Sequence, residues 1–133
     1  RNMSEAQMDD RCCDHQLVGP VVLRDYCLNF RQASTGYYAT LDEKNGHQVD
    51  GILWLISKED EAILDGFEGV SSGWYYKKIV SVHLNGVMLD ALVYLIPETR
   101  GVGRPPEWYV QRIQTAYERF GLDTEELIKM ANQ

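Results

Sequence analysis

Short apolar and alternating runs, separated by clusters of turn-forming residues, predict strands along much of the chain. Residues 21–23 and 26–30 form one bent strand or two short ones, and residues 37–41 form another strand that the turn-rich cluster 42–46 ends. Residues 48–56 carry the strongest strand pattern. Because this segment finishes in an uninterrupted apolar run, we expect it to be buried on both faces.

A first short helix is predicted at the beginning of the chain. Ser4 is a suitable N-cap, and acidic residues follow it in the first turns. The Gly19-Pro20 pair is a strong break signal, so we expect this helix to end there.

The clearest helix start lies in the middle of the chain. Ser57 and Asp60 have the spacing of a capping box. Ile63 and Phe67 are four residues apart and share one face of the predicted helix. A glycine on either side of Phe67-Glu68 can supply the left-handed stop. Glu68 therefore lies at or just beyond the end of this helix.

The last third of the chain predicts a hairpin followed by helices. Residues 75–84 and 87–96 alternate as strands do, and Asn85-Gly86 between them is a strong two-residue turn signal. A loop rich in Gly and Pro follows at residues 97–104, then one helix up to Gly121 and a last short one. The whole chain, residues 1–133, is predicted to be a single α+β domain with a mixed, mostly antiparallel sheet and short flanking helices.

Charge and composition exclude several classes of partner. The formal net charge is -7 and the basic residues are scattered, which excludes nucleic acid as the main partner. No apolar run approaches the about 20 residues of a membrane helix. Three cysteines with one adjacent pair fit reduced thiols better than disulfides or a zinc site, so we expect a cytoplasmic protein. Nothing in the sequence selects an oligomeric state.

Few residues carry a catalytic signal. The segment Gly69-Val70-Ser71-Ser72-Gly73 matches a serine-hydrolase pattern, but a helix precedes it and a strand follows, which reverses the required context. The three histidines lack a second ligand at metal spacing, so no metal site is predicted. Glu68 stands out in its glycine-flanked turn, although spacing alone does not distinguish it from an exposed turn carboxylate. Tyr94, near a strand end, needs a partner for its hydroxyl.

Several short motifs, in order and with similar spacing, resemble the γ-glutamyl cyclotransferase-like (AIG2-like) family. They cover nearly the whole chain and are Leu23-x-Asp25-Tyr26-x-Leu28-x-Phe30, Val49-x-Gly51-Ile52-Leu53-Trp54, Leu64-Asp65-x-x-Glu68-Gly69-Val70, Gly73-x-Tyr75, Ala91-x-x-Tyr94 and Pro105-x-x-x-Tyr109. The resemblance implies a compact domain with a small barrel-like sheet. It also implies that a γ-glutamyl amide closes on itself, releasing 5-oxoproline and a free amine without metal or cofactor.

The resemblance also assigns roles to individual residues. Glu68 stands at the family's acid/base carboxylate, and Tyr94 matches a tyrosine that helps to hold the substrate. Asn2 matches the last residue of a Tyr-Gly-Ser-Asn loop that binds the glutamyl group, and Arg1 stands where the family often has serine. Because the tyrosine and glycine of that loop are not in this sequence, we expect residues 1–133 to lack the first strand and part of the substrate-binding loop.

The substrate class has alternatives. The expected partner is a small γ-glutamyl molecule, and the leaving amine cannot be read from these residues. One alternative is a γ-glutamylamine cyclotransferase that acts on ε-linked glutamyl-lysine or removes a biosynthetic protecting group. A second is a non-catalytic member that keeps the fold and binds a small molecule.

Overall fold

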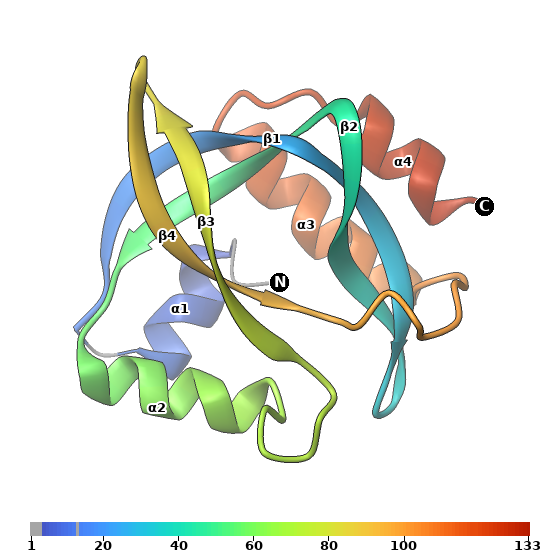
Figure 1. The fold of residues 1–133 in the computed structure, drawn as a ribbon, viewed down its shortest axis with the longest axis horizontal. Coiled ribbons are helices and arrows are strands. Elements are labelled where there is room, and N and C mark those ends of the chain that lie inside the picture. The colour runs from blue at the N-terminus through green and yellow to red at the C-terminus, as the bar shows by residue number, and fades with distance from the viewer. Residues whose placement is uncertain (1–3, 13) are drawn as a thin grey trace.

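The computed structural model describes residues 4–12 and 14–133. Their elements in chain order are α1 (Glu5–Arg11), β1 (Gln16–Ala33), β2 (Gly36–Leu55), α2 (Lys58–Phe67), β3 (Tyr76–Leu84), β4 (Val87–Leu95), α3 (Glu107–Arg119) and α4 (Glu125–Ala131). The strands form one antiparallel sheet in the order β2-β1-β3-β4 (Figure 1). The predicted α+β class is confirmed, and the sheet is antiparallel throughout.

The first helix ends earlier than the sequence predicts. Ser4 caps α1 as expected, with its hydroxyl accepting a hydrogen bond from the Gln7 backbone at 3.3 Å. The helix ends at Arg11, and Gly19 and Pro20 lie inside β1 instead of terminating α1. Gly19 sits at a shift in the β1–β2 register with a φ of 143°. The Gly19-Pro20 pair therefore marks an irregularity within strand β1 and not the end of a helix.

The predicted turn at residues 42–46 is also absorbed into a strand. In the ladder between β1 and β2, Arg24 lies opposite Gln48 and Tyr26 lies opposite Glu43. Residues 44–47 of β2 therefore form a bulge opposite a single residue of β1, Asp25. Asp25 has a φ of 65°, and its carboxylate accepts a hydrogen bond from the Gly46 backbone at 3.0 Å. Residues 21–30 thus belong to one bent strand, and the two strands predicted on either side of the turn form one.

The β3–β4 hairpin follows the sequence prediction closely. Asn85 and Gly86 have φ values of 49° and 81°, which suit a two-residue turn between twisted strands. This turn places Leu84 opposite Val87, and the same register places Lys77 opposite Tyr94. Facing residues in an antiparallel pair point to the same side of the sheet, so Lys77 and Tyr94 are neighbours.

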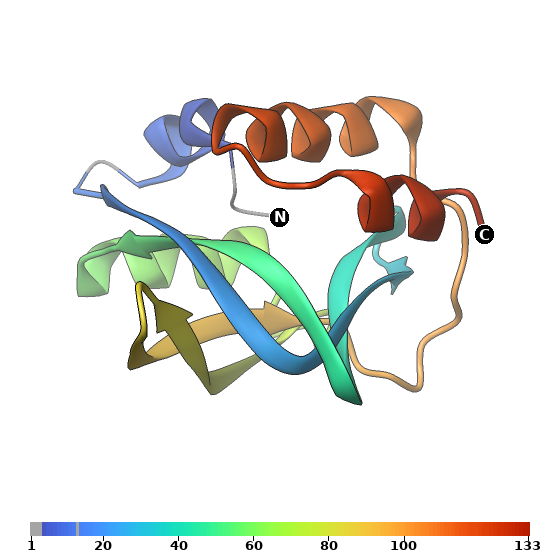
Figure 2. The same cartoon turned by 90° about the horizontal axis from the view of Figure 1, so that it is seen from above.

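The main core lies between the curved sheet and the two C-terminal helices. In Figure 2, α3 and α4 lie together on one side of β1 and β2. The side chains of Tyr109, Ile113 and Tyr117 on α3 and Leu127 on α4 are buried against strand residues such as Phe30. Their 3.6-residue periodicity explains why these helices form where they do.

The prediction that the apolar end of residues 48–56 is buried on both faces is wrong. Residues 52–56 are only partly buried, and Leu55 is 60% exposed, because this end of β2 is an edge of the sheet. On α2, the face shared by Ile63 and Phe67 is exposed, and the helix buries Leu64 and Asp60. The packing partners of each element, which local periodicity does not contain, decide which face is covered.

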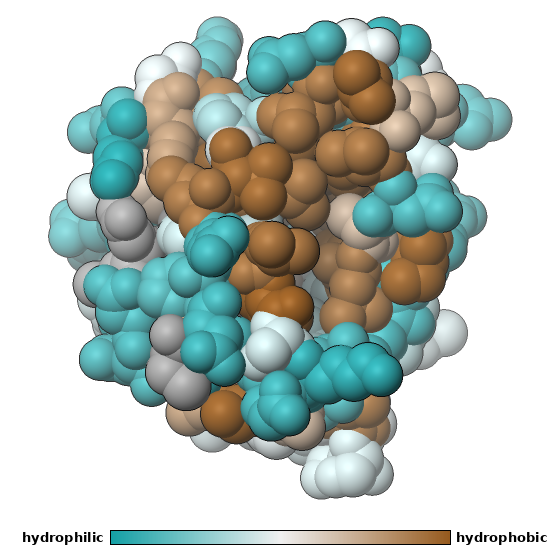
Figure 3. All heavy atoms as spheres, turned by 90° about the vertical axis from the view of Figure 1, so that its left-hand side faces the viewer, coloured by the Kyte–Doolittle hydropathy of each residue, from teal (hydrophilic) through white to brown (hydrophobic). Residues whose placement is uncertain are grey.

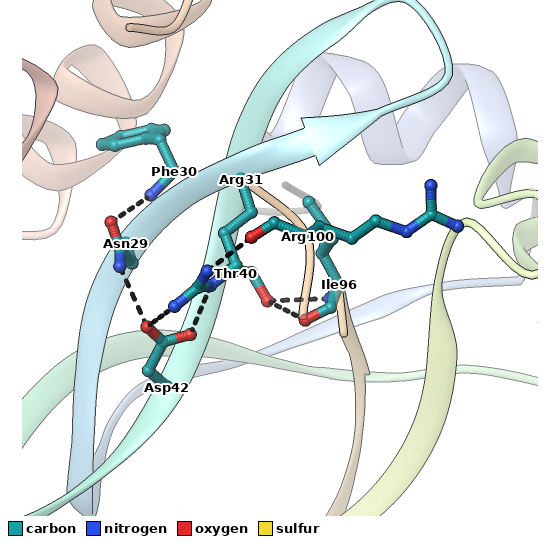
Figure 4. Close-up of polar contacts among 7 residues, drawn as sticks. All are labelled: Asn29, Phe30, Arg31, Thr40, Asp42, Ile96 and Arg100. Atoms are coloured by element: carbon teal, nitrogen blue, oxygen red, sulfur yellow. Dashed lines mark hydrogen bonds and ion pairs between the residues drawn. The ribbon is translucent and has the colours of Figure 1, made fainter. Parts of the chain in front are cut away.

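The loop between β4 and α3 is fastened to the sheet by a polar cluster (Figure 4). Arg31 donates to both carboxylate oxygens of Asp42, at 3.0 and 2.7 Å, and also to the Arg100 carbonyl. The Thr40 hydroxyl accepts a hydrogen bond from the Ile96 backbone at 2.8 Å. Such paired groups can be buried at little cost because their hydrogen-bonding capacity is used.

Within residues 4–12 and 14–133, no helix is long and apolar enough to cross a membrane.

Candidate active site

Glu68 is buried at the end of α2. The capping box that begins this helix is complete, since Ser57 and Asp60 exchange hydrogen bonds at 3.1 and 3.3 Å. Glu68 is the C-cap residue, and its backbone N–H donates to the Leu64 carbonyl at 2.8 Å. Gly69 then turns the chain with a φ of 62°. Glu68 is only 1% exposed, which is rare for a glutamate and sets it apart from an ordinary turn residue.

Helix α1 covers this end of α2. Met8 and Cys12 are buried against Leu64 in a small apolar cluster. From the same helix, the Arg11 guanidinium lies 3.7 Å from a carboxylate oxygen of Glu68. A buried carboxylate is tolerated only where charge or hydrogen bonds compensate it, and Arg11 supplies a positive charge at the site.

Tyr94 projects from β4 toward α2. Its hydroxyl donates a hydrogen bond of 2.6 Å to Asp65. Burial is the largest cause that raises the pKa of Tyr94, followed by the hydrogen bond to Asp65 and by the charges of Asp65, Glu61 and Glu68. The phenol therefore keeps its proton, and it is electrostatically coupled to Glu68.

A large apolar cavity lies beside these residues. Its volume is about 620 Å³, and Met8, Leu64 and Tyr94 line it close to the site. If Glu68 is the acid/base residue and Tyr94 holds the substrate, as the resemblance implies, both should face one cavity; Tyr94 lines this one, and Glu68 is not among its lining residues. The hollow opens on a strongly apolar face of the molecule (Figure 3).

The cavity lies between the two edges of the sheet. Strands β2 and β4 stand at opposite ends of the strand order, yet residues 51–55 of β2 and 89–94 of β4 both line the cavity. The sheet therefore curls until its edges face each other. Within the described chain, each edge strand has one hydrogen-bonded neighbour in the sheet. The apolar cavity is therefore bordered by the open edge of β2 on one side and by the open edge of β4 on the other.

The predicted site residues have different outcomes. The structure places Glu68 in a buried position and Tyr94 near it at the edge of the cavity. Arg1 and Asn2 lie outside the described residues, so their predicted role in substrate binding stays a prediction.

Sequence reasoning missed the polar residues around these two. Asp65 receives the Tyr94 hydroxyl, and Lys77 contacts Asp65 at 3.1 Å. A signal for Lys77 was present, because counting back from the Asn85-Gly86 turn already puts it opposite Tyr94. Arg11 could not have been found in this way, since its contact with Glu68 depends on how α1 packs against α2.

The alternative chemical motifs find no support. Gly69–Gly73 is a turn between α2 and β3, so Ser71 and Ser72 lack the strand–serine–helix context of a hydrolase. Among the described residues, Cys12 and Cys27 form no disulfide. No cluster of His, Cys, Asp and Glu suited to a metal occurs among the described residues.

Comparison with known proteins identifies the family. The family model "Gamma-glutamyl cyclotransferase, AIG2-like" matches residues 2–112. The chain belongs to this family. A solved structure of a γ-glutamyl cyclotransferase superposes with a TM-score of 0.87 at 25% identity, over 97% of this chain and 80% of that one. A search of curated protein sequences finds no match.

Other solved members of the fold differ in how much of their length is matched. The uncharacterized protein loc79017 from Homo sapiens matches with a TM-score of 0.86 at 26% identity, over 97% of this chain and 80% of that one. YkqA from Bacillus subtilis matches with a TM-score of 0.79 at 27% identity, over 98% of this chain but 49% of its own. The γ-glutamyl cyclotransferase-like fold is thus shared over nearly all of residues 1–133.

Proposed function

We propose that this protein is a cyclotransferase that converts a small γ-glutamyl amide into 5-oxoproline and a free amine, with Glu68 as general acid/base. The observation that carries the proposal is the nearly complete burial of Glu68, close enough to Tyr94 for its charge to act on the phenol, in a chain that belongs to the γ-glutamyl cyclotransferase family. A carboxylate is removed from water at considerable cost, and a proton-transfer role explains why it is kept there.

The reaction requires little from the protein beyond positioning and two proton transfers. Glu68 takes a proton from the α-ammonium group, and the free amine attacks the γ-carbonyl carbon to form the ring C–N bond. The bond between that carbon and the leaving nitrogen then breaks, and the leaving nitrogen takes the proton from Glu68. The ring nitrogen still carries one surplus proton, which passes through the freed Glu68 carboxylate to the released amine, so the lactam nitrogen keeps one hydrogen and the amine leaves as an ammonium. Because amine and carbonyl belong to one molecule, holding them in a near-attack geometry supplies most of the rate enhancement.

Tyr94 is proposed to hold the glutamyl group. Tyr94 lines the mostly apolar cavity and its hydroxyl is fixed by Asp65, so the side chain offers a polar group in a fixed position. Arg1 and Asn2 are proposed to complete the binding site, as the sequence resemblance implies. The site needs no metal or cofactor for the steps above.

We further propose that a strand upstream of Arg1 completes the sheet between β2 and β4. The two facing edges and the apolar cavity between them support this, since one added strand would pair with both edges and occupy the part of the space between them, leaving the end beside Tyr94 for the substrate. The sequence resemblance places the remainder of the glutamyl-binding loop on the same segment. The full-length protein is therefore the form in which activity is expected.

The decisive experiment incubates the full-length protein with γ-glutamyl amino acids and γ-glutamyl amines and measures 5-oxoproline. Glu68→Gln should lower turnover by about 10²- to 10⁴-fold, because the amide cannot carry the proton. Glu59→Gln is the matched control, since Glu59 lies in the exposed first turn of the same helix and should leave turnover unchanged.

The other outcomes separate the alternatives. Release of free lysine from ε-linked glutamyl-lysine, faster than turnover of γ-glutamyl amino acids, favours the γ-glutamylamine cyclotransferase. Full turnover by Glu68→Gln contradicts the mechanism. Binding of γ-glutamyl compounds without any 5-oxoproline formation favours the non-catalytic member of the fold.

A further inference from the structure

Four polar residues join helix α2 to the β3–β4 hairpin beside the proposed site. Glu61 and Asp65 are one helical turn apart on α2, so they share a face. Lys77 and Tyr94 are directly opposite in the β3–β4 register and face that helix. We call Glu61, Asp65, Lys77 and Tyr94 the α2–hairpin clamp.

The contacts within the clamp are not equivalent. Lys77 forms ion pairs with both Glu61 and Asp65, whereas the Tyr94 hydroxyl donates its 2.6 Å hydrogen bond to Asp65. The Glu61 carbonyl oxygen is farther from that hydroxyl, at 3.4 Å. A hydroxyl has one proton to donate, and the short bond to a carboxylate takes it.

Lys77 keeps Asp65 in the form that Tyr94 needs. Burial acts to raise the pKa of Asp65, but the hydrogen bonds from Tyr94 and Lys77 outweigh it, and the pKa is lowered. The ion pairs also raise the pKa of Lys77. Asp65 is therefore an ionised acceptor with one oxygen on each partner, and the hydroxyl proton of Tyr94 points toward α2.

We infer that Asp65 is a positioning residue that makes Tyr94 a hydrogen-bond acceptor toward the substrate. With its proton committed to Asp65, the phenol oxygen has only lone pairs to offer, and the complementary group on a γ-glutamyl compound is the α-ammonium. Tyr94 then binds the cationic end of the glutamyl group and orients its amine for ring closure. This inference rests on the proposed function, and it deepens that proposal by giving the site a preference for substrates with a free, charged α-amine.

The test compares two isosteric changes that each remove one carboxylate from Lys77. Asp65→Asn leaves one neutral oxygen for which the Tyr94 hydroxyl and the Lys77 ammonium compete, and its N–H2 group can donate to the phenol, so the proton of Tyr94 is no longer committed to α2. Glu61→Gln leaves the Asp65–Tyr94 bond in place. In the full-length protein, we expect Asp65→Asn to raise KM for γ-glutamyl compounds by about tenfold with a smaller change in kcat. Glu61→Gln should stay within about twofold of the wild type, although thermal unfolding should register a similar loss of one ion pair in both variants.

Tyr94→Phe shows whether Asp65 acts through the tyrosine. If it does, Asp65→Asn and Tyr94→Phe raise KM to a similar extent, and the double variant is no worse than either. Tyr94→Phe changes no charge, so it also probes the same hydroxyl should Asp65→Asn fold poorly.

Three results would overturn the inference. The first is an unchanged KM in both Asp65→Asn and Tyr94→Phe, and the second is an equal rise in KM in Asp65→Asn and Glu61→Gln, which marks a purely structural clamp. Additive effects in the double variant are the third. Wild-type protein that forms no 5-oxoproline overturns the proposed function itself, whereas an active wild type with any of these results overturns only the role of Asp65.

Discussion

The hydrogen-bond partners of the aspartates Asp42 and Asp65 indicate different roles for these two residues. Asp42 accepts hydrogen bonds from both Arg31 and Asn29, and these occupy both of its oxygens. Asp65 is shared between Tyr94 and Lys77 at the edge of the proposed site. We interpret Asp42 as structural because its bonds tie the two long strands together, and Asp65 as a residue that acts through its neighbour.

The structural role of Asp42 predicts a pH-dependent loss of stability. Burial acts to raise the pKa of Asp42, but hydrogen bonds from Arg31 and Asn29 lower it below the ordinary 3.8. A carboxyl whose pKa is lowered by folding stabilises the fold above the ordinary pKa, and the contribution is lost as pH falls through the lower folded value. Asp42→Asn should lower the free energy of unfolding by about 2 kcal/mol at pH 7.

Urea unfolding at pH 7 and near pH 3 checks this prediction. The difference between Asp42→Asn and the wild type should shrink at the lower pH, and an equal difference at both pH values would contradict it. Glu43→Gln is the control, since the neighbouring Glu43 pairs with Lys78 on the exposed surface and its loss should cost less than about 1 kcal/mol.

At the scale of elements, the end of α2 determines where Glu68 can lie. The helix begins at a capping box and ends just before a glycine in the left-handed region, so its length is set at both ends by local chemistry. Covering by α1 and the contact with Arg11 then come from packing between helices. The turn after Glu68 is the weak point, because only glycine adopts its backbone conformation without strain.

Substituting the two glycines around Glu68 should have opposite effects on stability. Gly69→Ala puts a Cβ at φ 62° and 3.3 Å from the Trp74 ring, which should cost about 1–2 kcal/mol. It should also reduce 5-oxoproline formation by displacing Glu68. Gly66→Ala lies inside the helix with open space around its Cβ and should stabilise by about 1 kcal/mol or less. Thermal unfolding of both variants tests this, and equal destabilisation would contradict it.

At the scale of the whole molecule, the sheet is curled, but no strand among the described residues joins its two edges. Its open side carries the start of β1, the end of β2 and the β3–β4 turn (Figure 1). Apolar side chains in these segments are exposed, by 61% for Met88, and the others are Leu17, Val18, Leu55 and Val87. Exposed apolar side chains gathered in this way are typical of surfaces that bind another segment or molecule.

The proposed upstream strand gives this surface a testable occupant. Residues 1–133 alone should bind an apolar fluorescent dye in the cavity and should unfold at a lower temperature than the full-length protein. The full-length protein should bind much less dye, because the added strand covers the apolar space between the two edges. Equal dye binding and equal melting temperatures would contradict the proposal, and a concentration-dependent loss of dye binding by residues 1–133 would favour a second copy as the occupant.

Local rules account for the elements that the sequence predicted well. The Ser57–Asp60 box, the Asn85-Gly86 hairpin and the position of Glu68 at a helix end all depend on hydrogen bonds and backbone angles within a few residues. The predictions failed where a long-range ladder overrode a local signal. Strand β2 continues past residues 42–46 because β1 remains available as a partner on both sides of the bulge.

The sequence by itself determined that Glu68 ends a capped helix and, through the length of one turn, that Lys77 lies opposite Tyr94. It also contained the motifs by which the family was identified. Only the tertiary structure decided that Glu68 is buried, that Arg11 accompanies it, that Asp65 receives the Tyr94 hydroxyl and that the edges of the sheet face each other. The physical reason is range, since capping and turn geometry act between near neighbours in the chain, whereas burial and charge pairing depend on which faces of separate elements pack together.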